Sequence, residues 1–178
     1  MTGVKGKKPV AEGSFISMEI FTQGQIMSGL TDQHKSRITG LGHPESYKTG
    51  DVICTAGTES SKFYFVEEGE VVVEIEYGKG MFIPISIVAP GQVFGWSALI
   101  PPYRHTANCV ALSKARIIAV ERNALLALIR NEPALGVIFM QNLAGVIASR
   151  LTNLELELLQ VLRGSQSAPD VLHINLQK

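Results

Sequence analysis

The sequence predicts a mainly β domain with flanking helices: a double-stranded β-helix (a jelly-roll-like β-roll) followed by a long C-terminal helix. Three observations predict this fold class. Short segments of alternating apolar and polar residues, separated by glycine and proline turns, recur over residues 45–120. Helical spacing of the apolar residues replaces this alternation on both sides of that region. Residues 133–163 then continue without a strong helix breaker up to Gly164.

The composition is that of one globular domain with arms. The chain has 178 residues, and 46% of them are apolar, which is enough to bury a core. No uninterrupted apolar run reaches the ~18 residues of a transmembrane helix, so none is expected. Two well-separated cysteines favour a reducing cytoplasm. The expected division is a flexible N-terminal arm at 1–20, a domain at 21–163 (β-roll at about 45–120, helices at 121–163) and a loose tail at 164–178.

The elements before the β-roll are expected to be helical. Apolar anchors at Ile26, Leu30 and Ile38 have helical spacing within residues 15–42. Thr31 followed by Asp32 is typical of the N-cap of a short helix. Gly40 and Gly42 then end the helical order, and strand periodicity is expected from about Tyr47 onward.

The strands follow from period-2 alternation. Residues 63–66 are aromatic and β-branched, and residues 71–77 alternate apolar with mainly acidic side chains, as in a half-buried strand. The segment 78–80 predicts a hairpin turn into a returning strand over residues 81–87. Pro84 in that strand favours an edge position. Residues 108–112 and 115–120 predict two further strands.

The C-terminal third is expected to be helical. Asn123 is a candidate N-cap for a helix that ends near Arg130, and Pro133 fits the first turn of the next helix. Residues 133–163 predict either one long helix or two helices in tandem with a bend near Gly136. Gly164 is a natural C-terminal cap.

The long helix carries a heptad seam with spacings of 4, 3, 4, 3, 4 and 3 residues, which is typical of a coiled coil. We therefore expect a parallel homodimer, in which Arg150 at a g position faces Glu155 at an e position of the partner. Packing of the same stripe on the chain's own β-roll is the alternative, and both can hold on different faces. The seam with its flanking charges comprises Met140, Ala144, Ile147, Arg150, Leu151, Leu154, Glu155, Leu158 and Val161.

The segment 94–107 carries the strongest functional signal. It predicts a strand end, a glycine turn, one short helical turn and a loop with an arginine before the next strand. Backbone N–H groups at such a turn suit an anion, and Arg104 can add bidentate hydrogen bonds to a phosphate or carboxylate. The candidate ligand-binding residues are Phe94, Gly95, Trp96, Ser97, Ala98, Arg104, His105, Thr106 and Ala107.

This segment resembles the phosphate-binding cassette of cyclic-nucleotide-binding domains, the effector half of Crp–Fnr (catabolite-activator-type) regulators. The pattern Tyr47-x-x-Gly50-Asp51-x-Ile53-x-x-x-Gly57 and the pattern Tyr64-x-Val66-x-x-Gly69-x-Val71 resemble the early strands of that family, and the resemblance covers about residues 24–163. It implies an eight-stranded β-roll, a dimerising final helix and a cyclic nucleotide or other small anionic ligand. In these regulators a helix-turn-helix unit follows the dimer helix. Only residues 164–178 follow it here, so with a net charge of zero no nucleic acid is expected to bind to this chain by itself.

Two positions depart from the family pattern. Where cyclic-nucleotide binders have a glutamate that accepts a hydrogen bond from the ribose, this chain has Trp96. The loss of such a bond costs about 1.5–3 kcal/mol. The family spacing of the loop arginine falls on His105, with Arg104 one residue early. Trp96 either stacks on a planar ligand or fills the pocket, and Arg104 either binds an anion or is a surface arginine.

Three functions compete on these residues. The first is a non-enzymatic sensor or regulatory module that signals through the long helix, with a protein partner as a further candidate. The second is a structural or docking subunit with a vestigial ligand pocket. The third, a cupin-type metal enzyme, needs clustered histidine and carboxylate ligands, and the four histidines are scattered, so neither catalysis nor a metal site is expected. Cys54 and Cys109 are interpreted as buried small hydrophobes.

Overall fold

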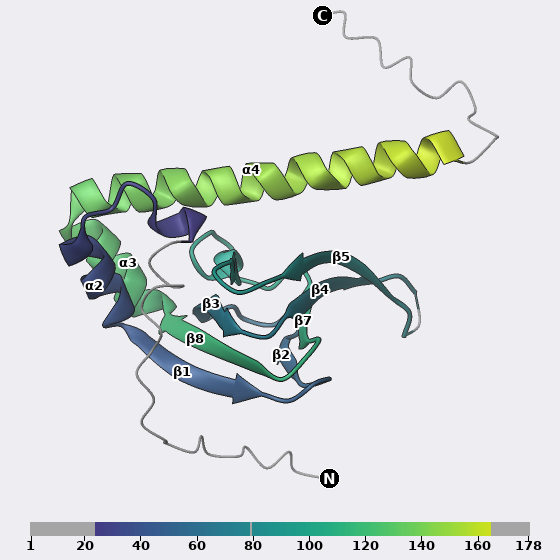
Figure 1. Cartoon of the computed structure of the whole chain (residues 1–178), viewed down its shortest axis with the longest axis horizontal. Coiled ribbons are helices and arrows are strands. Elements are labelled where there is room, and N and C mark those ends of the chain that lie inside the picture. Colours follow the sequence, from purple (N-terminus) through teal and green to yellow (C-terminus); the bar gives the residue numbers. More distant parts are fainter. Residues whose placement is uncertain (1–23, 79, 165–178) are drawn as a thin grey trace, which may run out of the picture.

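The computed structural model describes residues 24–78 and 80–164 and confirms the β-roll with its long C-terminal helix (Figure 1). The predicted arm at 1–20 and the tail beyond Gly164 lie outside the described residues. The eight strands are β1 (Gly42–Tyr47), β2 (Val52–Cys54), β3 (Lys62–Glu68), β4 (Val71–Glu76), β5 (Phe82–Val88), β6 (Val93–Phe94), β7 (Asn108–Ala111) and β8 (Ala115–Glu121). The helical elements are η1 (Gln25–Met27), α2 (Asp32–Thr39), η2 (Trp96–Ala98), α3 (Arg122–Asn131) and α4 (Pro133–Gly164).

The strands form two antiparallel four-stranded sheets, in the orders β1-β8-β3-β6 and β2-β7-β4-β5. Strands β3 and β8 are buried on both faces, which explains their nearly continuous apolar sequences. Successive residues of β3 therefore enter different cores. Phe63 and Phe65 pack against the helices, whereas Tyr64 and Val66 point into the interior of the roll.

The β4–β5 hairpin differs in part from the expected half-buried pair. Strand β5 lies at the sheet edge, as Pro84 predicted. However, a register shift between Val73 and Glu74 breaks the simple alternation, and the outer half of the hairpin extends beyond the roll (Figure 1). As a result Ile75 and Ile83 are 46% and 48% exposed.

The helices that precede and follow the roll are shorter or differently capped than expected. Thr31 is confirmed as the N-cap of α2, because its hydroxyl accepts a hydrogen bond from the backbone N–H of His34 at 3.2 Å. Strand β1 already begins at Gly42, five residues before the expected change of period. The prediction of an Asn123 cap is wrong. The N-cap of α3 is Glu121, and the backbone N–H of Arg122 donates to the carbonyl of Ser61, so the chain passes directly from β8 into α3.

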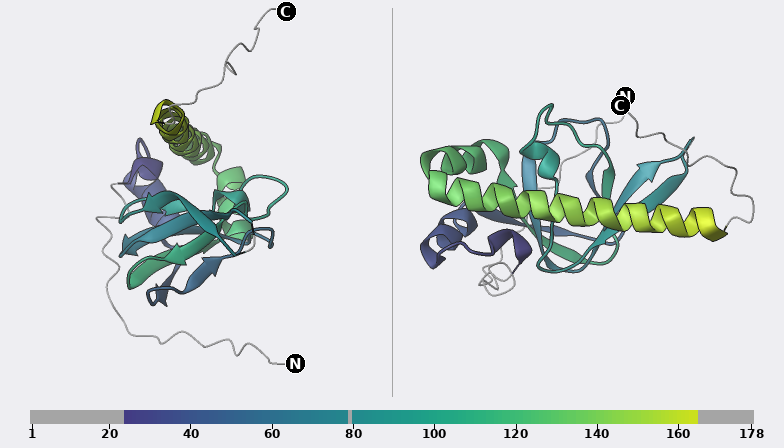
Figure 2. Two further views of the ribbon diagram at one scale, coloured as in Figure 1. Left: turned by 90° about the vertical axis from the view of Figure 1, so that its right-hand side faces the viewer. Right: turned by 90° about the horizontal axis from the view of Figure 1, so that it is seen from above.

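Helix α4 is one continuous helix and lies along one side of the roll (Figure 2). Gly136 produces no break. Instead, it allows close packing on α3, since a Cβ there would lie 2.6 Å from the carbonyl oxygen of Ile129. An inner stripe of four buried side chains holds the N-terminal half of α4 on the core, with Asn142 donating to the carbonyls of Ile26 and Ser28 at 3.0 and 2.7 Å. The inner stripe is Leu135, Phe139, Leu143 and Val146.

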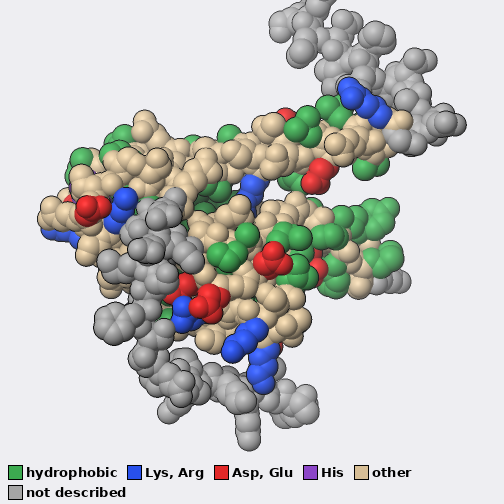
Figure 3. All heavy atoms as spheres, viewed as in Figure 1, with side chains coloured by type: hydrophobic (Ala, Val, Ile, Leu, Met, Phe, Trp, Pro, Cys, Tyr) green, Lys and Arg blue, Asp and Glu red, His purple; other side chains and the backbone are tan. Residues whose placement is uncertain are grey.

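By length and composition alone, α4 could also cross a membrane, a criterion that core helices of globular proteins pass as well. The first half of α4 is apolar because its inner stripe is buried against the core of the domain. Apolar side chains of the second half of α4 are exposed, and they lie on the same side of the molecule as the exposed apolar side chains of the β4–β5 hairpin (Figure 3).

Candidate ligand-binding site

A tight corner after β6 builds the candidate site. Gly95 has a left-handed backbone (φ 74°), and a Cβ at this position would lie 2.7 Å from Cδ2 of Tyr64. Only glycine therefore fits both the conformation and the space. The ring of Phe94 stacks on that of Tyr64 with centroids 4.7 Å apart, which fixes the corner on β3. The single turn η2 then packs Trp96 against the core shared with the helices and brings Trp96 and Ser97 into the wall of a small cavity.

Backbone hydrogen bonds join the loop around His105, which closes the site, to the loop around Gly57 and Thr58. The N–H of His105 donates to the carbonyl of Thr58 at 3.0 Å, and the N–H of Gly57 donates to the carbonyl of His105 at 2.8 Å. Burial lowers the pKa of His105, which favours its neutral form. The Arg104 guanidinium donates through Nη1 to the carbonyl of Gly57. Arg104 is thus engaged with the neighbouring loop.

The cavity at this corner, here called the Trp96 pocket, has a volume of about 30 Å³. Such a volume holds little more than a water molecule, whereas ligand cavities commonly span roughly 300–1,000 Å³. Seven of the nine predicted ligand-binding residues line it. The other two do not line it: Ala98 is fully buried, and Arg104 is not in the wall. The lining is Val73, Phe94, Gly95, Trp96, Ser97, His105, Thr106, Ala107, Cys109 and Arg150.

Arg150 is the residue of this site that the sequence interpretation assigned elsewhere. Its guanidinium lies over the Trp96 ring, 4.6 Å from the centroid, and donates to the carbonyl of Val93. Burial lowers the pKa of Arg150. No carboxylate of the described residues pairs with it. The one sequence signal for this orientation is that Arg150 lies four residues after Val146 and so continues the face of the inner stripe, but the heptad register fits the same position.

The predicted dimer seam lies beside the inner stripe. Ile147 and Leu154 are half-buried, and the other apolar members of the seam are exposed, including Leu151 at 57% and Val161 at 69%. The intramolecular contacts of α4 thus use mainly another face, and most of the seam stays accessible for a second chain. The dimer stays a prediction. The pairing of Arg150 with the partner's Glu155 also stays a prediction, and within one chain the Arg150 side chain contacts Trp96 and Val93.

The described residues contain no group of three or more His, Cys, Asp and Glu side chains that could hold a metal ion. Cys54 and Cys109 are opposite each other on β2 and β7, and their predicted burial is confirmed. Contact with Cys109 and burial raise the pKa of the Cys54 thiol far above its usual range, so that this thiol stays protonated.

A β-roll with a glycine corner, a loop-closed pocket and a long helix against it defines a class of small-ligand-binding regulatory domains. The comparison with protein families agrees: residues 44–132, half of the chain, match the model of the cyclic nucleotide-binding domain. The chain therefore belongs to the cyclic nucleotide-binding domain family, as the resemblance of residues 94–107 predicted.

Relatives from bacteria illustrate the membership. The cyclic AMP receptor protein of Thermus thermophilus is 30% identical over 112 residues, which are 63% of this chain and 50% of that protein. A structure from Geobacter metallireducens, described as a cyclic nucleotide-binding protein, matches with a TM-score of 0.66 and 28% identity over 77% of this chain and 99% of that one. The Thermus thermophilus catabolite activator protein matches with a TM-score of 0.66 and 27% identity, covering 78% of this chain and 64% of that one. The chain spans about half the length of the curated relatives it matches.

Proposed function

We propose that this chain is a non-enzymatic regulatory module that binds a small anionic ligand in the Trp96 pocket and transmits its occupancy to α4. The proposal includes a homodimer through the α4 seam and a location in the cytoplasm. Several relatives are named for cyclic AMP, which makes a cyclic nucleotide the first ligand to test.

The observation that carries this proposal is the stacking of Arg150 on Trp96. Trp96 lines the pocket and Arg150 belongs to α4, so the pocket and the helix share a contact. A ligand of nucleotide size cannot enter the present volume unless lining side chains move, and Trp96 is the largest of them. A movement of Trp96 removes the surface on which Arg150 rests, and a ligand that prefers the displaced state therefore shifts the position of α4.

We expect Trp96→Glu to increase the affinity for cyclic AMP by about tenfold or more, because it empties the pocket and restores a carboxylate for the ribose hydroxyl. Isothermal titration of wild type and variant with cyclic AMP and cyclic GMP measures the change. Trp96→Gln is the matched control: it creates the same space without the charge and should gain less. A folded Trp96→Glu variant that binds no better than wild type would contradict the ligand assignment.

A docking subunit with a vestigial pocket is the second candidate, and the small volume of the Trp96 pocket favours it. The Gln and Glu variants separate the two functions. A pocket that has only been filled regains ligand when the indole is removed. A vestigial pocket gains nothing from either substitution.

A further inference from the structure

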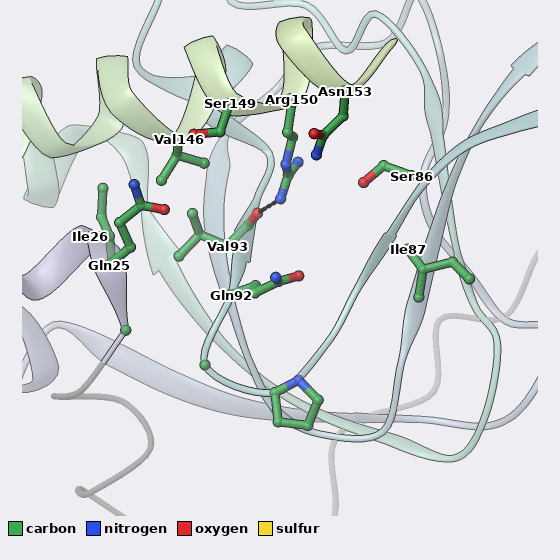
Figure 4. Close-up of a pocket in the computed structure, with 13 residues that line it drawn as sticks. Gln25, Ile26, Ser86, Ile87, Gln92, Val93, Val146, Ser149, Arg150 and Asn153 are labelled. Atoms are coloured by element: carbon green, nitrogen blue, oxygen red, sulfur yellow. Dashed lines mark hydrogen bonds between the residues drawn. The ribbon is translucent and has the colours of Figure 1, made fainter. Parts of the chain in front are cut away.

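A second and larger hollow lies between α4 and the turn that joins β5 to β6. Its volume is about 510 Å³, within the range of small-molecule sites. We call it the α4 groove, and Figure 4 shows its side chains converging from η1, the turn and α4. It is lined by Gly24, Gln25, Ile26, Ser86, Ile87, Pro90, Gly91, Gln92, Val93, Val146, Ser149, Arg150 and Asn153.

The groove contains the guanidinium of Arg150, which has no counter-ion among the described residues. Arg150 extends from α4 toward the β6 backbone, and among the described residues its guanidinium donates a hydrogen bond to the carbonyl of Val93 (Figure 4). A guanidinium has five N–H donors, so most of them are unused within the described residues. Placing a charge away from water is costly unless an opposite charge compensates it. An anion in the groove would supply that compensation.

Neutral polar groups surround this cation. The Gln92 side chain accepts a hydrogen bond from the N–H of Ala89 at 3.0 Å, which leaves its NH₂ group as a donor. The Ser149 hydroxyl donates to the carbonyl of Gly145 and keeps its lone pairs as acceptors. The side-chain amides of Gln25 and Asn153 lie at the groove and make no hydrogen bond to any described residue (Figure 4). Donors and acceptors at several points suit a ligand that carries hydroxyl groups beside its charge.

We propose that the α4 groove binds a small oxyanion-bearing metabolite, a phosphate monoester or a carboxylate, whose oxyanion pairs with Arg150. The ligand's hydroxyl groups contact Gln92, Ser149 and Asn153. This site goes beyond the proposed function, because the groove formed by the described residues has its volume without any movement of Trp96. The ligand would contact Arg150, Ser149 and Asn153 on α4 and Gln92 in the β5–β6 turn, so an occupied groove holds α4 against that turn.

The test is isothermal titration of the full chain with glycerol 3-phosphate, citrate and inorganic phosphate at constant ionic strength. We expect saturable one-site binding of at least one probe. Arg150→Gln should weaken it by about tenfold or more, since it removes a charge-assisted pair. Ser149→Phe should weaken it similarly by filling the groove. Arg104→Gln, a matched loss of a guanidinium outside the groove, and Thr106→Val in the Trp96 pocket should leave the affinity unchanged.

Three results would overturn the groove site. They are no saturable binding of any probe, undiminished binding by both groove variants, and loss of binding in Thr106→Val but not in Ser149→Phe. The last result would place the anion in the Trp96 pocket. If Arg150→Gln fails to fold, Ser149→Phe decides alone. The cyclic AMP gain expected for Trp96→Glu does not depend on these outcomes, so each proposal can fail separately.

Discussion

Replacing Leu151 and Leu154 together by glutamate is expected to convert the chain from a dimer to a monomer. Both residues lie on the heptad seam in the second half of α4, where Leu151 is 57% exposed. In a parallel coiled coil each seam residue inserts between four side chains of the partner helix. Two glutamates per chain would bring four carboxylates into that apolar seam, and their desolvation and repulsion would outweigh the remaining contacts.

Sedimentation velocity measures this change directly. Leu156→Glu is the matched control, because Leu156 is similarly exposed, at 54%, but occupies the f position opposite the seam. It should leave the mass of the dimer unchanged. A wild-type chain that sediments as a monomer, or a double variant that keeps a dimer's mass, would show that the seam does not join two chains.

Truncation of Phe139 to alanine should lower the free energy of unfolding by about 3–5 kcal/mol. Phe139 is fully buried, and its ring contacts Phe63 of β3 edge to face with centroids 5.9 Å apart. It is the largest side chain of the inner stripe that attaches α4 to the roll. Its removal leaves a cavity between helix and sheet that the surrounding β3 and α3 side chains cannot fill.

Urea unfolding followed by circular dichroism gives the magnitude. Val137→Ala is the control on the same helix: Val137 is 58% exposed, and its truncation should change the stability by about 0.5 kcal/mol or less. A loss below about 1 kcal/mol for Phe139→Ala would mean that α4 is not anchored through this residue.

Much of the fold is predictable from local patterns. Thr31 and Pro84 each indicate a structure that depends on few neighbours, and the structure confirms both, together with the expected pairing of β4 with β5. The glycine corner at Gly95 is encoded locally through its positive φ, whereas the Tyr64 ring that also excludes a Cβ comes from the distant strand β3. The segment 94–107 could therefore be identified as a candidate site from the sequence alone.

Other features depend on contacts between distant segments. The register shift near Val73 arises from pairing with β5 and leaves no sequence signal. Asn123 has the residue type of a cap, but a hydrogen bond from Arg122 to Ser61 starts α3 earlier. Arg150 satisfies the heptad pattern and also continues the inner stripe. Only the packing of α4 on the roll decides that it faces Trp96 rather than solvent.

Amide hydrogen exchange of the Trp96→Glu variant, with and without saturating cyclic AMP, tests the coupling between the pocket and α4 most directly. We expect the ligand to slow exchange over residues 94–107 and also to change the exchange rates of α4 around Arg150. Slower exchange over 94–107 together with unchanged rates throughout residues 140–161 would contradict the coupling, because the pocket would then be occupied without any response of the helix.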